Sequence, residues 1–252
     1  MERALQFSNI MDSKEFIEAT IALDYEKNDV LLRNFALILT LVGVTSIDIS
    51  ANPNSIGHIK AGINDAILIS EKLDINLNTL PFIKVSLGFL NPSDHRSYCL
   101  GSNQAIKDNL YLCLEAGSEI IELHHGNMEE DNFLSILEII NELSSNLPVS
   151  LSVNRVYQSN AHLINLINKA YDVHKENIIL QIDGATSGGL DESYSSTLQS
   201  LATSDILIKE LKIKDRRKFK KMKLTICGDI NTKTTALALI CNIDYSGISL
   251  GH

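Results

Sequence analysis

One unit recurs along most of this chain: a helical stretch ends at a glycine or a short polar break, and a run of β-branched and apolar residues follows. Two runs follow a glycine, VTSIDIS (residues 44–50) and SEIIELH (residues 118–124). NIILQIDG (residues 177–184) and YSGISLGH (residues 245–252) repeat the pattern. Helices that alternate with short strands are typical of βαβ units and a parallel sheet. The polar residues that close these strands should then lie at one shared edge of the sheet.

The hydrophobic periodicity predicts eight strands and seven helices. The expected strands are residues 16–23, 46–50, 82–87, 119–124, 149–153, 178–183, 224–227 and 245–250. The expected helices are residues 28–42, 54–73, 103–116, 131–144, 160–174, from 192 to beyond 208, and 232–241.

We predict an α/β fold, a (β/α)8 TIM-barrel-like single domain over residues 1–252, because about 250 residues suit one such barrel. A doubly wound open sheet is the alternative, but residues 24–27 (DYEK) lack the glycine-rich fingerprint that follows its first strand. The eighth helix is missing or replaced, since the sequence stops just after the last strand. Either the domain is truncated, or residues 1–13 or a second subunit cover that side.

The net charge of −9 hides an asymmetry. The tract from Lys209 to Lys223 carries nine basic and two acidic residues, a local charge of +7. The acidic remainder argues against general nucleic-acid binding, which depends on basic contacts to phosphate. The tract is either a solvated insertion between two strands or a docking patch for a protein partner, nucleic acid or membrane surface.

The four cysteines lack close spacing, which indicates reduced thiols and a cytoplasmic location. An iron–sulfur cluster held by local CxxC motifs is therefore not expected, and no other cofactor is indicated. Cys113 and Cys241 fall on expected helices and are most simply core residues. The longest apolar run, residues 35–44, is too short to span a membrane, so no membrane contact through a span is expected.

Chemistry in a barrel belongs to the loops and residues at the carboxyl ends of its strands. The candidate catalytic residues chosen by this rule are Asp48, Glu122, His124 and Asp183. Convergent carboxylates with a histidine suit a divalent metal, or a general acid or base whose pKa like charges raise. Alternatively, each acid caps a helix or pairs with a Lys or Arg. Lys84 lies in mid-strand, which argues against a Schiff-base aldolase.

The segment GDINTKTT (residues 228–235) is the best candidate anion site. Gly228 permits close backbone approach, and Asn231 or Thr232 can cap the next helix, whose amides attract an anion. Barrels often bind phosphate after strands seven and eight, and Gly251 would form the other wall. The alternative is a plain capped helix.

Four segments carry a resemblance to a known family: LILTLVGVTSIDISANPNSI (37–56), VSLGFLNPSDHRS (85–97), LQIDGATSGGLD (180–191) and ICGDINTKTT (226–235). Together they resemble the cyanobacterial light-dependent period protein family, whose iron–sulfur members pass redox state to the circadian clock. An uncharacterised plastid family of barrel-like proteins is a more distant match. The resemblance implies a barrel with ligand-binding loops. The chain departs from the family in lacking the cysteine-rich segment that holds the cluster.

Two functions are consistent with these observations. The resemblance implies a regulatory or redox-signalling binding module without the cluster, which holds a small anionic ligand or a protein partner. The strand-end residues favour instead an aldolase-type barrel enzyme, a lyase or isomerase acting on a small phosphorylated or carboxylated metabolite. If the missing helix leaves an apolar stripe bare, we expect a homodimer through that side.

Overall fold

The computed structural model describes residues 2–13, 16–21, 26–89, 97–98, 102–125, 128–154, 160–174, 177–183, 207, 209–211, 222–227 and 245–250. Its strands are β1 (Ile17–Ile21), β2 (Ser46–Ser50), β3 (Phe82–Phe89), β4 (Ser97–Tyr98), β5 (Ile120–His124), β6 (Val149–Asn154), β7 (Ile178–Asp183), β8 (Lys223–Cys227) and β9 (Tyr245–Leu250). Its helices are α1 (Glu2–Ser13), α3 (Asp29–Leu41), α4 (Pro53–Leu73), α5 (Asn103–Ala116), α6 (Glu130–Leu143) and α7 (Asn160–Val173).

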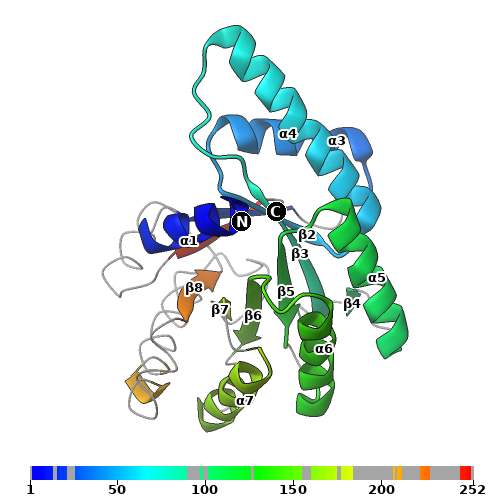
Figure 1. The fold of residues 1–252 in the computed structure, drawn as a ribbon, viewed down its shortest axis with the longest axis vertical. Helices are drawn as coiled ribbons and strands as arrows, with labels where there is room; N and C mark the ends of the chain where they lie inside the picture. The colour runs from blue at the N-terminus through cyan, green and yellow to red at the C-terminus, as the bar shows by residue number, and fades with distance from the viewer. Residues whose placement is uncertain are drawn as a thin grey trace.

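The described strands close into a parallel barrel. β1 pairs with β2 and β9, β2 with β3, and β3 with β5, all in parallel. The ring continues through β6, β7 and β8 back to β9. Among the described strands, only β4, which the sequence did not predict, runs antiparallel, against the end of β3. The predicted TIM-barrel-like α/β fold is confirmed, and helices α3 to α7 surround the strands (Figure 1).

Local signals in the sequence explain where the helices begin and end. The Asn28 side chain caps α3 by accepting from the Leu31 amide at 3.1 Å, and Asn52 caps α4, where Pro53 fills the first turn. Gly117 ends α5 in the left-handed conformation, with φ of 107°, which costs glycine little. The expected boundaries of these helices are therefore within a residue or two of those observed.

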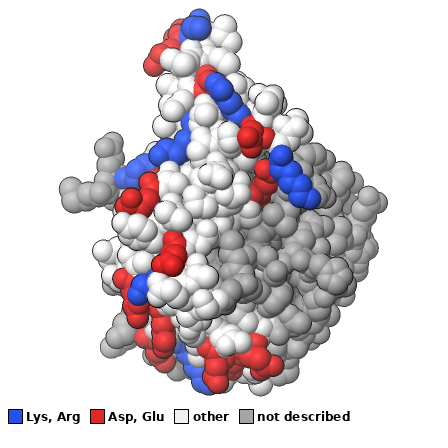
Figure 2. Space-filling model, turned by 90° about the vertical axis from the view of Figure 1, so that its right-hand side faces the viewer, with Lys and Arg blue, Asp and Glu red and all other residues white. Residues whose placement is uncertain are grey.

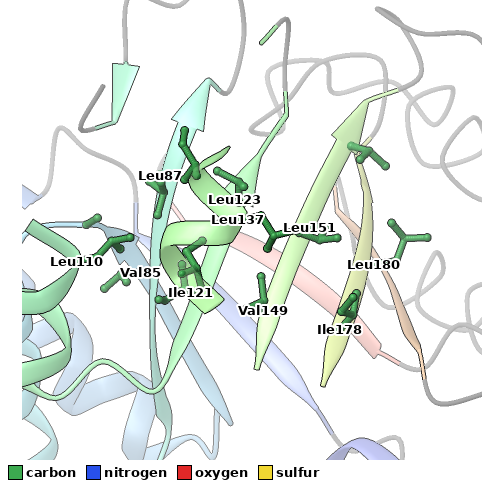
Figure 3. Packing of buried hydrophobic residues seen from close by; sticks show 14 of the residues in the cluster. Val85, Leu87, Leu110, Ile121, Leu123, Leu137, Val149, Leu151, Ile178 and Leu180 are labelled. Carbon is green, nitrogen blue, oxygen red and sulfur yellow. The ribbon is translucent and has the colours of Figure 1, made fainter. Parts of the chain in front are cut away.

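The main core lies between the strands and the helices outside them (Figure 3). Its strand residues alternate along each strand, as Val85 and Leu87 do on β3 and Ile121 and Leu123 on β5. Cys113 of α5 is a buried free thiol in this core, as predicted. Because alternate side chains of a strand point to opposite faces, the residues between these core positions point into the barrel.

Helix α1 closes the amino-terminal end of the barrel. A second apolar cluster joins helix residues Phe7, Ile10 and Met11 to residues at the starts of the strands, Phe16, Phe82, Ile120 and Ile179. Arg3 adds polar contacts there, donating to Glu119 at 2.6 and 2.7 Å and to the Leu80 carbonyl at 3.0 Å. Residues 1–13 were expected, as one choice, to cover the side of the barrel where an eighth helix would pack. They plug the bottom instead, because their apolar side chains match the apolar first layer of the strands.

The expected helices at 192–208 and 232–241 fall almost wholly outside the described residues, as does most of the basic tract at 209–223. Acidic and basic side chains are interspersed with broad uncharged areas on the face in Figure 2. No helix in the described part of the chain has the length and apolar character needed to cross a bilayer.

Candidate functional site

The side chains that point into the barrel change from apolar to charged two residues beyond the start of the strands. On β3 the inward position moves from Phe82 to Lys84, and on β5 from Ile120 to Glu122. Phe16 and Glu18 make the same change at β1. The apolar residues belong to the cluster under α1, whereas the polar residues form a second layer above it. Charged and polar side chains are therefore enclosed in the middle of the barrel.

Lys84 is the centre of this polar layer and only 1% exposed. Its Nζ donates to Glu18 Oε1 at 2.6 Å and to Glu122 Oε2, and lies 3.8 Å from Asp48 Oδ2. Three carboxyl groups from β1, β2 and β5 thus surround one ammonium. Such a group is costly to bury even when it is paired, and replacing it by apolar residues often stabilises a protein. Its presence in the barrel centre therefore points to function.

Glu122 links this ammonium to a histidine nearer the barrel mouth. Its Oε1 lies 2.8 Å from His124 Nε2 and accepts from Gln181 Nε2 at 3.1 Å. Burial alone would raise the pKa of Glu122, but the charge of Lys84 and the contact with His124 hold it well below its usual range. Glu122 is therefore ionised at neutral pH, and it orients the imidazole of His124, which is the last residue of β5.

Asp48 lies in the same layer but, unlike Glu122, holds its proton at neutral pH. Burial raises its pKa to about 8 against the opposing charge of Lys84, and the nearby carboxylates of Glu122 and Glu18 add to the rise. Ser86 Oγ donates to Asp48 Oδ1 at 2.6 Å, and Thr20 Oγ1 donates to Oδ2 at 3.2 Å. At neutral pH Asp48 is largely a carboxylic acid beside an ionised glutamate. Two carboxyl groups whose pKa values are pushed apart are a common basis for acid–base chemistry.

A further carboxylate lies at the carboxyl end of β2. Glu26 accepts from the Ser50 amide at 2.7 Å, from the Ser50 hydroxyl, and from Ser55 Oγ at 3.4 Å. Burial raises its pKa. The side chain holds the start of α4 against the strand end, so we assign it to the support of the site.

The hydroxyl of Ser150 is a further polar group inside the barrel. Ser150 is fully buried on β6, in register with Glu122, and its Oγ has no hydrogen-bond partner in the structure. Unpartnered buried polar atoms are uncommon in proteins and often mark a site for water or a ligand.

The structure brings together three of the predicted catalytic residues, Asp48, Glu122 and His124. Asp48 and Glu122 lie in the middle of the barrel, whereas the sequence predicted them at the carboxyl ends of the strands. Asp183 ends β7, but its side chain is outside the described residues. The predicted anion-binding residues Gly228, Asn231, Thr232 and Gly251 are also outside them. All of these roles stay predictions.

A metal was the other use considered for the convergent acids. The residues that the structure describes form no cluster of three or more ligands suited to a metal ion. The ammonium of Lys84 lies where the acids converge and supplies the positive charge. His125, next to His124, points the other way and packs on Phe133 with ring centroids 5.1 Å apart.

Sequence reasoning missed Lys84 and Glu18 as site residues. Lys84 was set aside because it lies in mid-strand, and Glu18, near the start of β1, was not considered. A signal was present, because each is the only charged residue of its strand. Lys84 is also in register with the candidate acid Asp48 on the neighbouring strand.

Comparison with known proteins identifies the fold. No protein-family model matches the sequence, and none of the curated proteins matches it. Among solved structures, the chain is similar to a putative deoxyribose-phosphate aldolase from Coccidioides immitis, with a TM-score of 0.63 and 8% identity over 97% of this chain and 93% of that one. A putative deoxyribose-phosphate aldolase from Toxoplasma gondii gives a TM-score of 0.61 and 11% identity, covering 96% of this chain and 90% of that one. The carboxyl transferase domain of Rhizobium etli pyruvate carboxylase gives 0.60 and 11%, covering 98% of this chain and 42% of that one.

The fold is that of an aldolase-type barrel. At these identities the likeness concerns the fold alone. The resemblance to the light-dependent period family is wrong, because the structural neighbours are aldolases and neither sequence comparison supports that family. The regulatory role in circadian clock input and the cyanobacterial origin are withdrawn with it. The segments that suggested the family are short, and they consist of the small and polar residues that helix caps and strand ends favour in many (β/α)8 barrels.

Proposed function

We propose that this protein is an aldolase-type barrel enzyme, a lyase or isomerase, that acts on a small phosphorylated or carboxylated carbonyl compound in the cytoplasm. The observation that carries the proposal is the enclosed group formed by Lys84, Glu122 and His124, with Asp48 beside it in the neutral form. Proton transfer next to a carbonyl needs a base and an acid that coexist at one pH. This layer offers both.

The roles follow from the contacts. His124, at the mouth end of β5, removes a proton from the carbon beside the substrate carbonyl. Glu122 keeps the imidazole in orientation and stabilises it once it has become charged. The electron pair moves to the carbonyl oxygen, to which the carboxylic acid of Asp48 donates its proton. Lys84 holds Glu122 ionised throughout.

Lys84 serves in this proposal as a fixed charge and not as a nucleophile. Attack on a carbonyl needs a neutral amine, whereas the contacts to Glu18 and Glu122 favour the ammonium. The substrate's phosphate or carboxylate would be held by the segment around Gly228, Asn231 and Thr232, with Gly251 opposite. This position matches the general preference of such barrels.

Hydrogen–deuterium exchange at the substrate tests the proposal. The protein is incubated in D2O with pyruvate and, separately, with dihydroxyacetone phosphate, and proton NMR follows the hydrogens next to the carbonyl. We expect catalysed exchange with at least one compound, and a loss of at least about 100-fold in His124→Gln and in Asp48→Asn, as for other general acids and bases. Arg33→Gln, which changes an ion pair on the outer helices, is the matched control.

Two results would contradict the proposal. One is the absence of exchange and of thermal stabilisation with both compounds. The other is exchange that persists in His124→Gln and Asp48→Asn. Borohydride added during turnover checks the assigned role of Lys84, since it would trap an imine on that residue, and the expected outcome is no mass increase.

A further inference from the structure

Helix α3 ends a chain of packed helices. The extensive helix contacts among described elements run from α3 to α4, then to α5, α6 and α7. α3 meets α4 closely: Arg33 donates to Asp65 at 2.5 and 2.8 Å, and Asp29 lies 3.3 Å from His58. A Cβ added at Gly62 of α4 would lie 2.2 Å from the Arg33 carbonyl oxygen. One side of α3 is therefore fully engaged.

The opposite side of α3 carries an exposed apolar stripe. Leu31, Ile38 and Val42 are exposed, Ile38 by 53% and Val42 by 70%, and Phe35 between them is partly buried. At roughly 100° per residue in an α-helix, these four positions lie on the side of α3 turned away from Arg33 and α4.

The outer face of β1 shows the same exposure, because Ile17, in register with Ser246 of β9, is 43% exposed. α3 and β1 thus each leave apolar side chains exposed. Soluble proteins rarely expose contiguous apolar surface unless it binds something.

The spacing of the stripe specifies the kind of occupant. Leu31, Phe35, Ile38 and Val42 are separated by four, three and four residues, which is the spacing of the apolar seam between two helices. No charged residue interrupts these positions. Two copies of α3 that meet antiparallel about a two-fold axis would each supply the complementary seam without like-charge repulsion, and their helix dipoles would oppose favourably.

We propose that the protein forms a two-fold dimer in which the stripe of α3 packs against the same stripe of a second copy. A helix of 13 residues offers a short seam, so the contact is weaker than that of an obligate dimer.

Sedimentation velocity on the full chain between about 1 and about 300 µM tests this, a range suited to a small interface. We expect a monomer–dimer equilibrium within the range. Ile38→Glu should weaken it by at least about tenfold, which corresponds to about 1.4 kcal/mol. Leu112→Glu on α5 is the matched control, because Leu112 is also 53% exposed but lies outside the stripe, and it should leave the equilibrium unchanged.

A mixing experiment separates self-association from other occupants. Ile38→Glu and Ile38→Lys should each be monomeric alone and associate when mixed, because opposite charges then meet across the axis. Far-UV circular dichroism checks that both variants fold. A wild-type chain that stays monomeric over the whole range overturns the proposal, as does a dimer that Ile38→Glu leaves intact or a mixture that fails to associate.

Discussion

Two adjacent layers of the barrel interior are built from the same strands but differ in polarity. At the bottom, Phe16, Phe82 and Ile120 meet α1 in a dry apolar cluster. Two residues further along the same strands, Glu18, Lys84 and Glu122 form an enclosed charged group. The bottom stabilises the fold by removing apolar surface from water. Burying the charged layer costs desolvation free energy. The burial of apolar surface in the lower layer must offset this cost.

The largest effect should come from removing the central cation. Lys84→Met leaves Glu18 and Glu122 buried without a positive partner, and we expect the free energy of unfolding to fall by about 3–5 kcal/mol in urea denaturation. Lys107→Met is the matched control, since Lys107 pairs with Glu142 on the surface at 2.7 Å, and such pairs contribute little.

If Lys84→Met does not fold, the double variant with Glu122→Gln should recover part of the loss, because one buried charge is then removed. A Lys84→Met protein as stable as the wild type would show that the charged layer is not coupled to folding.

Phe7→Ala tests the apolar end. Phe7 makes edge-to-face contacts with Phe82 and Phe16, with ring centroids 5.3 and 5.8 Å apart. Its loss should lower the free energy of unfolding by about 3 kcal/mol, as for other buried phenylalanines. Leu5→Ala on the same helix is the control, because Leu5 is largely exposed. Equal effects of the two changes would mean that α1 does not plug the barrel.

A pH dependence of stability separates the two layers, because Asp48 titrates in the charged layer and the apolar cluster holds no titratable group. The pKa of Asp48 is raised from 3.8 to about 8 on folding, so the folded state binds the proton more tightly than the unfolded state. Its contribution is complete below pH of about 4 and is lost as the pH rises towards 8. Asp48→Asn should therefore flatten the decline of the urea midpoint between pH 5 and 8. Phe7→Ala should lower the midpoint equally at each pH, and an unchanged slope in Asp48→Asn would count against the raised pKa.

The order of the strands and of the described helices from α3 to α7 could be read from the sequence because each rests on local rules. Caps such as Asn28 and Gly117 set helix ends within a few residues of chain, and β-branched runs mark the strands. Helix α1 was not predicted, because its apolar residues are buried only by packing against the starts of strands that are distant in the sequence. The two-residue β4 was missed for the same reason: it exists by pairing with β3.

The candidate site was predicted in part. Asp48, Glu122 and His124 were found because they close strands, and the strand-end rule needs only sequence. Lys84 was set aside as a mid-strand residue, although its position on β3 puts it beside Asp48 and within reach of Glu122.

The sequence alone determined the alternation of helices and strands and which side chains of each strand face inward, since both depend on neighbours along the chain. Only the tertiary structure decided which inward residues meet. Lys84 reaches Glu18 across 66 positions and Glu122 across 38. Contacts between residues so far apart in the sequence depend on the closure of the barrel and on the register between its strands, which no local pattern encodes.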